Sequence, residues 1–408
     1  MRIAYITTYQ GPTLLKRRPI IRNRSLSNTV KIELIASLLR ANSHEVEVIS
    51  QGEVVDNQFK FYPAFSETQR FDSKIPVYYS SALPIRRING FWSSFRTLQL
   101  LKARYRAAPF DLVIIFNLKE PQVTCAKYAL RRLRLPVVLE YEDDRFVNVV
   151  GRGEDQNFLS EYRNQACKSL LEVVSGCIGV SPYLLSQLPE NVPKMLLRGV
   201  VGDDLSRASQ GMTEARLNRI LFSGTHIASN GIANLIAAWR VAPIPGWELH
   251  ITGQGQLTND LRQMVENVPG VFFHGLVSRP ELVELMSSAK ICINPHAVSQ
   301  TPGMVFAFKI IEYLAAGAHC VTTPMGKLEP ELEAGITYMP DNAPETIAAT
   351  LKRVIECRDY EHVAQMAAQD AYGTAAVSRT LGKFLDQVVK QTARKSLGQE
   401  SAESQVAC

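Results

Sequence analysis

Short runs of aliphatic and β-branched residues alternate with helical segments along this chain, and this alternation constrains its fold more than any other feature. In the first half, strand-like runs lie at residues 3–8, 46–50, 112–117, 137–141 and 177–181. Helical spacing fits three of the intervening segments, at 30–39, 121–134 and 158–174. Strands that alternate with helices form parallel sheets with helices on both faces. The first half therefore predicts an α/β, doubly wound sheet.

The second half repeats this rhythm and predicts a second domain of the same class. Its strand-like runs lie at 219–224, 247–253, 271–275, 291–296 and 319–323, and its helical segments at 231–242, 257–267, 279–289, 306–316, 344–357 and 361–371. Prolines and glycines interrupt the pattern between 186 and 215, and 408 residues exceed one ordinary core. We expect domains at 1–197 and 198–374, with residues 51–90 as an irregular insertion holding short strands. A helix at 375–391 and a disordered polar tail at 392–408 complete the predicted organisation.

The bulk composition is that of a globular protein, with 46% hydrophobic and 21% charged residues. No apolar run approaches the roughly 20 residues that span a bilayer. The first residues begin a strand and are too polar afterwards for a secretory signal. Seven scattered cysteines show neither metal nor disulfide spacing, which fits a reducing compartment. These features predict a cytoplasmic protein without a bound metal.

Positive charge is concentrated in the first third of the chain. Residues 1–137 contain 22 Lys/Arg and 9 Asp/Glu, a balance of +13, whereas the remainder contains 23 and 30, a balance of −7. The first domain is therefore expected to meet an anionic partner, such as an anionic lipid or a phosphorylated acceptor. Nucleic acid is the least favoured partner because no nucleic-acid-binding motif accompanies the charge.

Two basic segments carry much of this charge. The loop between the first strand and helix contains Lys16, Arg17 and Arg18, which we expect to contact the acceptor. The segment 91–106 interleaves aromatic and basic residues at helical spacing. It fits either an ordinary helix packed on the sheet, the interpretation we favour, or peripheral contact with an anionic membrane at its inner face.

Ligands of parallel sheets bind where strands end and helices begin, and five strand ends of the second domain carry suitable residues. These are Gly224-Thr225-His226, Gly253-Gln254-Gly255, His274-Gly275, His296 and the loop from Gly303 that leads to Phe308, Lys309 and Glu312. Glycines let backbone N–H groups approach a phosphate closely, and a carboxylate can accept hydrogen bonds from a ribose. The second domain is therefore predicted to bind a nucleotide.

The sequence of these strand ends resembles the donor domain of a GT-B glycosyltransferase of the family 4 type. The likeness lies in FSGTHIASNGIANLIAAW, LHITGQGQL and FAFKIIEYLAAGAHCVTTPMG, and HGLVSRPELVELMSSAKICINPH also fits. In the third segment, Phe306, Lys309, Glu312, Tyr313, Ala315 and Gly317 match a form common in bacterial members. The resemblance implies two Rossmann-like domains facing across a cleft, with a last helix that returns to the first domain. It also implies metal-independent transfer that retains the anomeric configuration.

By this resemblance Glu312 holds the ribose, and a set of neighbouring residues lines the diphosphate and sugar. The donor-binding set is Gly224, Thr225, Gly253, Gly255, His274, Arg198, Met304, Phe308 and Glu312. Three positions depart from the pattern: Met304 replaces an acidic residue, and Thr225 and Asn230 replace two cations. Another cation must then stabilise the negative charge that develops on the leaving diphosphate. Lys309 is the first choice for this role, Arg198 the second and His226 the third.

In the first domain, the run Glu140-Tyr141-Glu142-Asp143-Asp144 ends the strand at 137–141. Its carboxylates can orient the acceptor hydroxyl or accept its proton, and like charges nearby raise the pKa of a carboxyl group. We assign the catalytic role to Asp143, with acceptor contact by Glu142. The alternative is that this acidic turn caps the next helix or pairs with basic residues.

The sequence thus predicts a transferase of the EC 2.4 class, hexosyltransferase-like, that uses a UDP- or GDP-sugar and needs no other cofactor. The acceptor is expected to be a glycan or a lipid-linked molecule in polysaccharide or glycoconjugate biosynthesis. A catalytically silent scaffold on the same fold is the main alternative, because Thr225, Asn230 and Met304 replace charged residues of the family pattern. An epimerase or phosphorylase remains a third, supported by fold alone.

Overall fold

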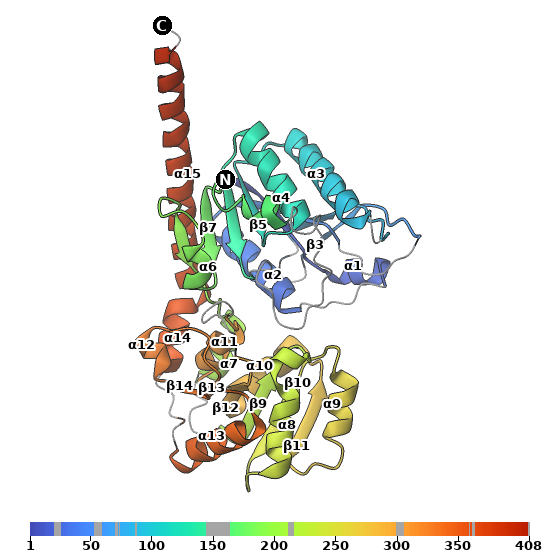
Figure 1. Cartoon of the computed structure of the whole chain (residues 1–408), viewed down its shortest axis with the longest axis vertical. Coiled ribbons are helices and arrows are strands. Elements are labelled where there is room, and N and C mark those ends of the chain that lie inside the picture. The colour runs from blue at the N-terminus through green and yellow to red at the C-terminus, as the bar shows by residue number, and fades with distance from the viewer. Residues whose placement is uncertain are drawn as a thin grey trace. The chain divides into compact units, whose positions relative to one another are not determined.

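The chain divides into two compact units, each built around one sheet. The computed structural model describes residues 1–19, 26–52, 59–69, 72, 74–85, 88–143, 164–210, 216–298, 306–358, 360 and 364–406. Unit 1 comprises Met1–Leu197 together with Ser378–Cys408, and unit 2 comprises Arg198–Val377 (Figure 1).

Unit 1 contains an eight-stranded sheet in the order β3-β4-β2-β1-β5-β6-β7-β8. Its strands are β1 (Arg2–Thr7), β2 (Glu45–Ser50), β3 (Phe65–Thr68), β4 (Pro76–Tyr79), β5 (Leu112–Phe116), β6 (Val137–Tyr141), β7 (Gly176–Gly179) and β8 (Lys194–Leu196). The pairings are parallel except that between β3 and β4, which lie in the segment expected to hold short strands. The predicted doubly wound sheet is confirmed; β5 and β6 are buried throughout, and β1 is buried after Arg2.

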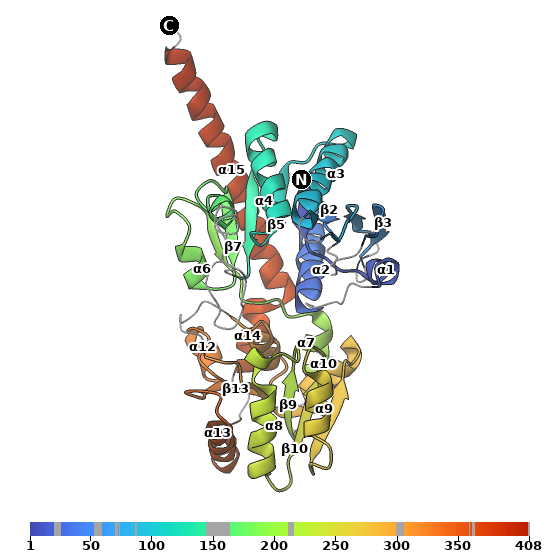
Figure 2. The same ribbon diagram turned by 45° about the vertical axis from the view of Figure 1, so that its right-hand side comes forward.

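The helices of unit 1 follow the sequence pattern closely, with additions in the loops. They are α1 (Pro12–Arg17), α2 (Leu26–Ala41), α3 (Asn89–Ala107), α4 (Glu120–Tyr128), a π-helical turn η1 (Ala129–Leu133) and α6 (Pro182–Ser186). Of the helix predicted at 158–174, residues 158–163 lie outside the described residues, 164–168 are helical and 169–173 form turns. The basic segment expected as a loop after β1 contains the short helix α1. Helices α3 and α4 pack side by side (Figures 1 and 2).

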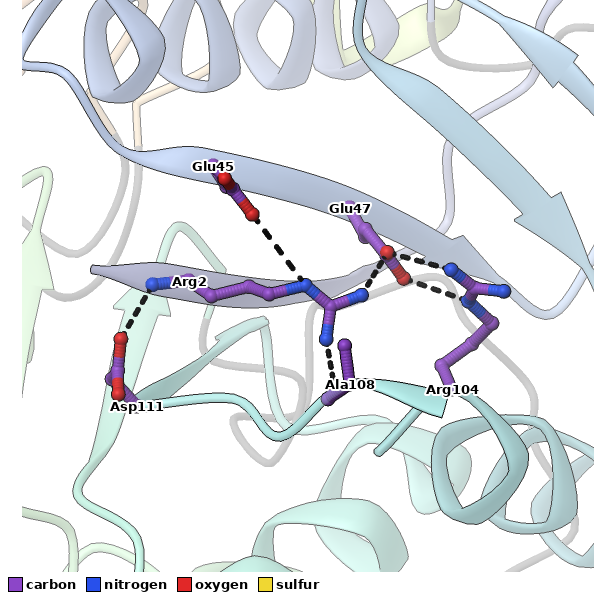
Figure 3. Close-up of polar contacts among 6 residues, drawn as sticks. All are labelled: Arg2, Glu45, Glu47, Arg104, Ala108 and Asp111. Atoms are coloured by element: carbon purple, nitrogen blue, oxygen red, sulfur yellow. Dashed lines mark hydrogen bonds and ion pairs between the residues drawn. The ribbon is translucent and has the colours of Figure 1, made fainter. Parts of the chain in front are cut away.

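An ion-pair network fixes the C-terminal end of α3 to the sheet. Arg104 forms two hydrogen bonds with the Glu47 carboxylate on β2, of 2.9 and 2.8 Å, and Arg2 on β1 binds the same carboxylate (Figure 3). The side chain of Arg2 also donates to the Ala108 carbonyl, and its backbone N–H donates to Asp111 Oδ2 at 2.6 Å. Because Glu47 is buried, this network ties α3 firmly to β1 and β2.

Unit 2 contains a six-stranded parallel sheet in the order β11-β10-β9-β12-β13-β14. Its strands are β9 (Leu217–Ser223), β10 (Glu248–Thr252), β11 (Val271–Gly275), β12 (Ala289–Asn294), β13 (His319–Thr322) and β14 (Ile336–Tyr338). Its helices are α7 (Asp203–Ser209), η2 (Ala228–Asn230, 3-10), α8 (Ile232–Val241), α9 (Thr258–Met264), α10 (Arg279–Ser288), α11 (Lys309–Ala315), α12 (Pro330–Glu333), α13 (Pro344–Glu356) and α14 (Ala364–Tyr372). The five predicted strands are present, and β14, which is too short to show a period, is additional.

Helices cover both faces of this second sheet. Leu221 points into one core together with α10, α11 and α14. Its neighbours Ile220 and Phe222 point into the other core, where α8 and α13 lie side by side (Figures 1 and 2). This two-sided burial explains why the strands read as continuous apolar runs.

The last helix, α15 (Thr374–Val406), packs on unit 1 from Ser378 onward. Its buried residues Phe384 and Val388 lie against Gly176 on β7, where a Cβ atom would come within 2.5 Å of Val388. A disordered tail was expected from Thr392, but the structure continues α15 to Val406. The segment lacks proline and contains Ala, Arg, Lys, Leu, Gln and Glu residues, which favour helix over coil. Among the described residues, no helix is both long and apolar enough to cross a membrane.

Candidate functional site

The loops after β9, β10 and β11 are hydrogen-bonded to one another at the C-terminal edge of the unit 2 sheet. Gly224 N–H donates to the Thr252 carbonyl at 3.1 Å, and His226 N–H donates to the Gln254 carbonyl at 3.0 Å. Gly253 N–H in turn donates to the Gly275 carbonyl at 2.7 Å. The strand ends singled out in the sequence therefore form one continuous edge.

The glycines of this edge have a clear packing role. Gly253 has a φ of +131°, and a Cβ atom there would lie 1.8 Å from the Gly224 carbonyl oxygen. A Cβ atom on Gly255 would lie 2.4 Å from the His226 carbonyl oxygen. These positions need glycine because the two loops touch through their backbones. Loop packing alone thus accounts for them, without reference to a phosphate.

Lys309 is the most unusual group at this edge. Its Nζ lies 4.4 Å from the centre of the Phe222 ring and is buried, with no hydrogen-bond partner among the described residues. A Cβ atom on Gly224 would come within 3.1 Å of this Nζ, so the glycine leaves room for the ammonium group. Burial lowers the pKa of Lys309 to about 7. An unpaired buried cation of this kind is ready to bind an anion.

Tyr313 fixes the position of Lys309 relative to the sheet. It lies one helical turn further along α11, and its hydroxyl donates to the Ser223 carbonyl at 3.1 Å. The same hydroxyl accepts a hydrogen bond from Ser223 N–H at 2.9 Å. This pair of bonds holds the first turn of α11 against the end of β9, next to Gly224.

Glu312 is bound by an arginine that the sequence analysis did not single out. Arg279, the first residue of α10, donates to Glu312 Oε1 at 2.7 Å and to Asp204 Oδ2 at 2.8 Å. The pKa of Arg279 is raised by these two carboxylates despite its burial. Glu312 and Lys309 thus have separate surroundings instead of forming one pair. The sequence indicated Arg279 only through its position directly after Ser278, which caps α10.

The other two proposed cations have different environments. Arg198 is engaged within unit 2, where it donates to Glu329 Oε1 at 2.7 Å and to the Lys327 carbonyl at 2.5 Å. His226 is buried, and its Nδ1 lies 3.1 Å from Thr258 Oγ1. Burial lowers the pKa of His226, so it is neutral near pH 7. Lys309 is therefore the strongest of the three as an anion partner.

Two of the three positions that depart from the resemblance, Thr225 and Asn230, lie in one loop. Asn230 Nδ2 donates to the Thr225 carbonyl at 2.7 Å, so the two neutral residues brace the turn between β9 and α8. Phe308 directly precedes α11 and is half-buried. Met304 lies outside the described residues.

His274 lies on a face of the sheet, within a chain of three side chains. Its Nε2 is 2.9 Å from His250 Nδ1, and His250 Nε2 is 3.0 Å from Glu248 Oε2. The pKa values of both histidines are lowered, chiefly by burial, with Arg219 adding to the effect. This contact joins His274 to β10 and leaves no direct link to Lys309.

In unit 1, the acidic turn after β6 belongs to a buried cluster. Glu140 is fully buried and accepts a hydrogen bond from the Tyr5 hydroxyl on β1. Lys31 on α2 binds Glu142 and lies 3.9 Å from Glu140 Oε1. Burial raises the pKa of Glu140 to about 7, with Lys31 opposing and Glu142 adding to the shift. Sequence analysis missed Tyr5 and Lys31, although a lysine between Val30 and Ile32 in a buried helix was a usable signal.

Asp143 follows this cluster at the surface. Asn117, at the end of β5, accepts hydrogen bonds from the backbone N–H groups of Glu142 at 2.7 Å and Asp143 at 3.2 Å. Asn117 has a φ of +60°, and its amide holds the acidic turn in place. The side chain of Asp143 is exposed, whereas Glu142 is engaged by Lys31.

The three basic residues after β1 lie in different environments. Lys16 and Arg17 are exposed on α1, with the guanidinium of Arg17 4.5 Å from the centre of the Phe65 ring. Arg18 is buried and donates to the carbonyls of Gly52, Pro63 at 3.3 Å and Ser80 at 2.8 Å. Burial lowers its pKa to about 10. The expected acceptor contact of Arg18 is replaced by a structural role, because its donors hold three backbone segments together.

The described part of the chain contains no group of three or more His, Cys, Asp or Glu side chains placed to hold a metal ion.

One family model matches part of unit 2. Residues 218–357 match the family model described as glycosyl transferases group 1. No curated protein sequence matches the chain.

Solved structures resemble the chain over almost its whole length. Sucrose-phosphate synthase from Thermosynechococcus elongatus superposes with a TM-score of 0.71 at 17% identity, covering 96% of this chain and 100% of that one. HepE of Anabaena in complex with UDP gives a TM-score of 0.63 at 14% identity, with coverages of 95% and 100%. A putative UDP-N-acetylglucosamine 2-epimerase from Listeria monocytogenes gives 0.57 at 12% identity, with coverages of 93% and 94%. At these identities the likeness shows the fold, two α/β domains of the GT-B type, and residues 218–357 are similar to the group 1 glycosyl transferases.

Proposed function

We propose that this protein is a retaining glycosyltransferase that moves a sugar from a UDP- or GDP-sugar to a glycan or lipid-linked acceptor. The observation that carries the proposal is Lys309, a buried ammonium group without a partner among the described residues, at a strand end of the matched domain. A leaving diphosphate develops negative charge, and a fixed cation is the group that stabilises it. The proposal needs no metal ion, and it assigns the protein to the cytoplasm.

The remaining roles follow from the environment of each residue. Glu312, held in place by Arg279, accepts hydrogen bonds from the ribose. Gly224 allows the diphosphate to approach Lys309, because it has no side chain beside Nζ. Thr225, Phe308 and Met304 complete the donor site, while His274 and Arg198 support it through their contacts with β10 and Glu329.

Acceptor recognition is assigned to unit 1. Lys16 and Arg17 are exposed and suited to a phosphate on the acceptor. Asp143 is exposed beside a carboxylate cluster and orients the acceptor hydroxyl, with Glu142 positioned by Lys31. The raised pKa of the buried Glu140 makes this cluster able to hold or release a proton near neutral pH.

Binding of UDP, GDP and their glucose conjugates to wild type and to Lys309→Gln, measured by calorimetry, tests the proposal. Loss of the cation should weaken binding of the matching nucleotide by about tenfold or more and reduce turnover about 10²–10³-fold. Lys352→Gln is the matched control, because Lys352 is exposed on α13 of the same unit. Equal affinities of wild type and Lys309→Gln for every nucleotide would refute the assignment of Lys309.

A second candidate, a binding protein without turnover, is favoured by the uncharged pair Thr225 and Asn230. Assays with radiolabelled sugar nucleotides and native membranes as the acceptor source separate the two candidates. Incorporation of label into lipid or glycan supports transfer, and tight nucleotide binding without incorporation supports the silent scaffold. Conversion of the donor without any acceptor would instead indicate epimerisation.

A further inference from the structure

Exposed aromatic side chains gather at the N-terminal half of α3 and the adjoining stretch 59–61. The members of this aromatic patch are Phe59, Phe61, Ile88, Phe91 and Phe95, with exposed fractions of 92, 55, 44, 71 and 43%. Scattered exposed apolar residues are normal on protein surfaces, but a cluster of this kind marks an interaction site.

Ring contacts show that the patch is contiguous. Phe91 and Phe95 are one helical turn apart and stack with their ring centres 6.5 Å apart. Phe61 meets the edge of Trp92 with a centroid separation of 6.2 Å, which joins the stretch 59–61 to α3. The Arg96 guanidinium lies 5.8 Å from the Trp92 ring, so a cation belongs to the same surface.

The exposure of this patch is a consequence of how α3 packs. Ser93, Thr97 and Leu101 form the buried side of the helix, and the first two are small and polar. The network of Arg104, Glu47 and Arg2 fixes the opposite end of α3 (Figure 3). The exposed rings of Phe91 and Phe95 therefore lie off the side by which α3 packs on unit 1.

The sequence around the patch is basic, and one carboxylate lies beside it: Glu120 Oε2 is 3.0 Å from the Cβ position of Gly90, at the start of α3. Residues 73–110 contain seven basic residues and no Asp or Glu: Lys74, Arg86, Arg87, Arg96, Lys102, Arg104 and Arg106. Of these, Arg104 is neutralised by Glu47, whereas Arg96 and Lys102 have no carboxylate partner within the described residues. Lys60, between Phe59 and Phe61, is exposed and adds a further cation.

We propose that this aromatic patch docks unit 1 onto an anionic lipid bilayer. Aromatic rings favour the boundary between headgroups and acyl chains, and basic side chains beside them bind anionic headgroups. Each basic residue near the surface strengthens binding about fivefold. A mainly basic rim suits a lipid surface, which presents phosphate in every direction. The inference is independent of the proposed sugar transfer, since it uses none of the residues assigned to that reaction.

Vesicle co-sedimentation tests the proposal with the full chain. Wild type should bind vesicles of phosphatidylcholine and phosphatidylglycerol, and high salt should release it. Binding to phosphatidylcholine alone should be weaker by about tenfold or more. No binding to either vesicle, or equal binding to both, would overturn the proposal.

The triple variant Phe59→Ser, Phe91→Ser and Phe95→Ser should lose about tenfold or more of this partitioning. The matched control is Val241→Ser with Met366→Ser, which removes apolar side chains of similar exposure, 84 and 75%, from unit 2. Thermal unfolding shows whether each variant is folded. Retained binding by a folded triple variant, or equal loss by the control, would contradict the assignment.

Trp92 supplies a readout that does not depend on substitution of the patch. The other two tryptophans, Trp239 and Trp247, are buried in the core of unit 2. Brominated acyl chains should therefore quench wild-type fluorescence on anionic vesicles, and Trp92→Phe should abolish that quenching. Unchanged quenching in Trp92→Phe would place the membrane contact elsewhere. Nucleotide binding without vesicles should be the same in all these variants, which separates this inference from the proposed transferase site.

Discussion

Lys309 and Glu312 show how far a motif can be interpreted one residue at a time. They are three residues apart on α11, yet Glu312 binds Arg279 and Lys309 has no partner among the described residues. The pairing of Glu312 depends on α10, which is brought beside α11 only by the folded sheet. The motif drew attention to Lys309 but could not reveal that this lysine has no partner among the described residues.

The isolation of Lys309 makes a prediction about pH. Because its pKa is about 7, the Lys309 side chain is mostly protonated below pH 7. Above pH 7 it must take up a proton when the anionic ligand binds. Affinity for the matching nucleotide sugar should therefore be flat below about pH 7 and fall by up to about tenfold per pH unit above it. Calorimetry in buffers of different ionisation enthalpy measures the proton uptake directly.

Lys309→Arg is the control for this pH dependence. Arginine stays protonated throughout this range, so its profile should be flat if it binds at all. A nucleotide sugar is preferable to UDP as the ligand, since its diphosphate lacks a terminal phosphate that titrates near neutral pH. A flat wild-type profile would show that Lys309 is charged before the ligand arrives.

Arg18 and Arg198 illustrate the opposite outcome at this scale. Both were predicted from the sequence to contact a ligand, and in the structure both form hydrogen bonds with other groups of the protein. The carbonyls that Arg18 binds come from segments 34 to 62 residues away in the chain. No local pattern indicates such partners.

At the scale of elements, strands and helices were predictable because their apolar periods are strong and long. The exceptions are short: α7, α12 and β14 have three to seven residues and too few positions to show a period. The glycine-containing loops were recognised as functional candidates, but their close contact through Gly253 and Gly255 was visible only in the structure.

Gly253 gives a test of this loop packing. Gly253→Ala should destabilise unit 2 by about 2–4 kcal/mol, because the new Cβ atom meets the Gly224 carbonyl oxygen 1.8 Å away. Gly246 also has positive φ, +75°, but nothing lies within 4 Å of its Cβ position. Gly246→Ala should therefore cost only about 1–2 kcal/mol. Differential scanning calorimetry measures both, and equal costs would argue against contact between the loops.

At the scale of the whole molecule, the sequence indicated two similar α/β domains and a charge difference between them, and the structure has two such units. It also assigns residues from Ser378 onward to unit 1, so that unit is built from both ends of the chain. The last helix contributes Leu381, Phe384 and Val388 to the unit 1 core.

This arrangement predicts that a mutation near the C-terminus weakens the N-terminal domain. Phe384→Ala should destabilise unit 1 by about 3–5 kcal/mol, because it opens a cavity against Gly176 on β7. Its neighbour Lys383 is exposed, and Lys383→Ala should change stability by no more than about 0.5 kcal/mol. Hydrogen exchange of β7 amides separates the two cases. Unchanged protection of β7 in Phe384→Ala would show that α15 contributes little to unit 1.

Local patterns in the chain were enough to determine the parallel sheets, and they predicted the strand ends and the lysine that we propose for ligand binding. Periodicity encodes these features directly, because a buried strand or a helix face must repeat every two or about 3.6 residues. Tertiary structure alone decided that Arg18, Arg198 and Glu312 bind other groups of the protein. It also decided that Lys309 has no such partner among the described residues. The physical reason is that the stability and pKa of a charge depend on burial and on neighbours within a few ångströms, which come from segments far apart in the sequence.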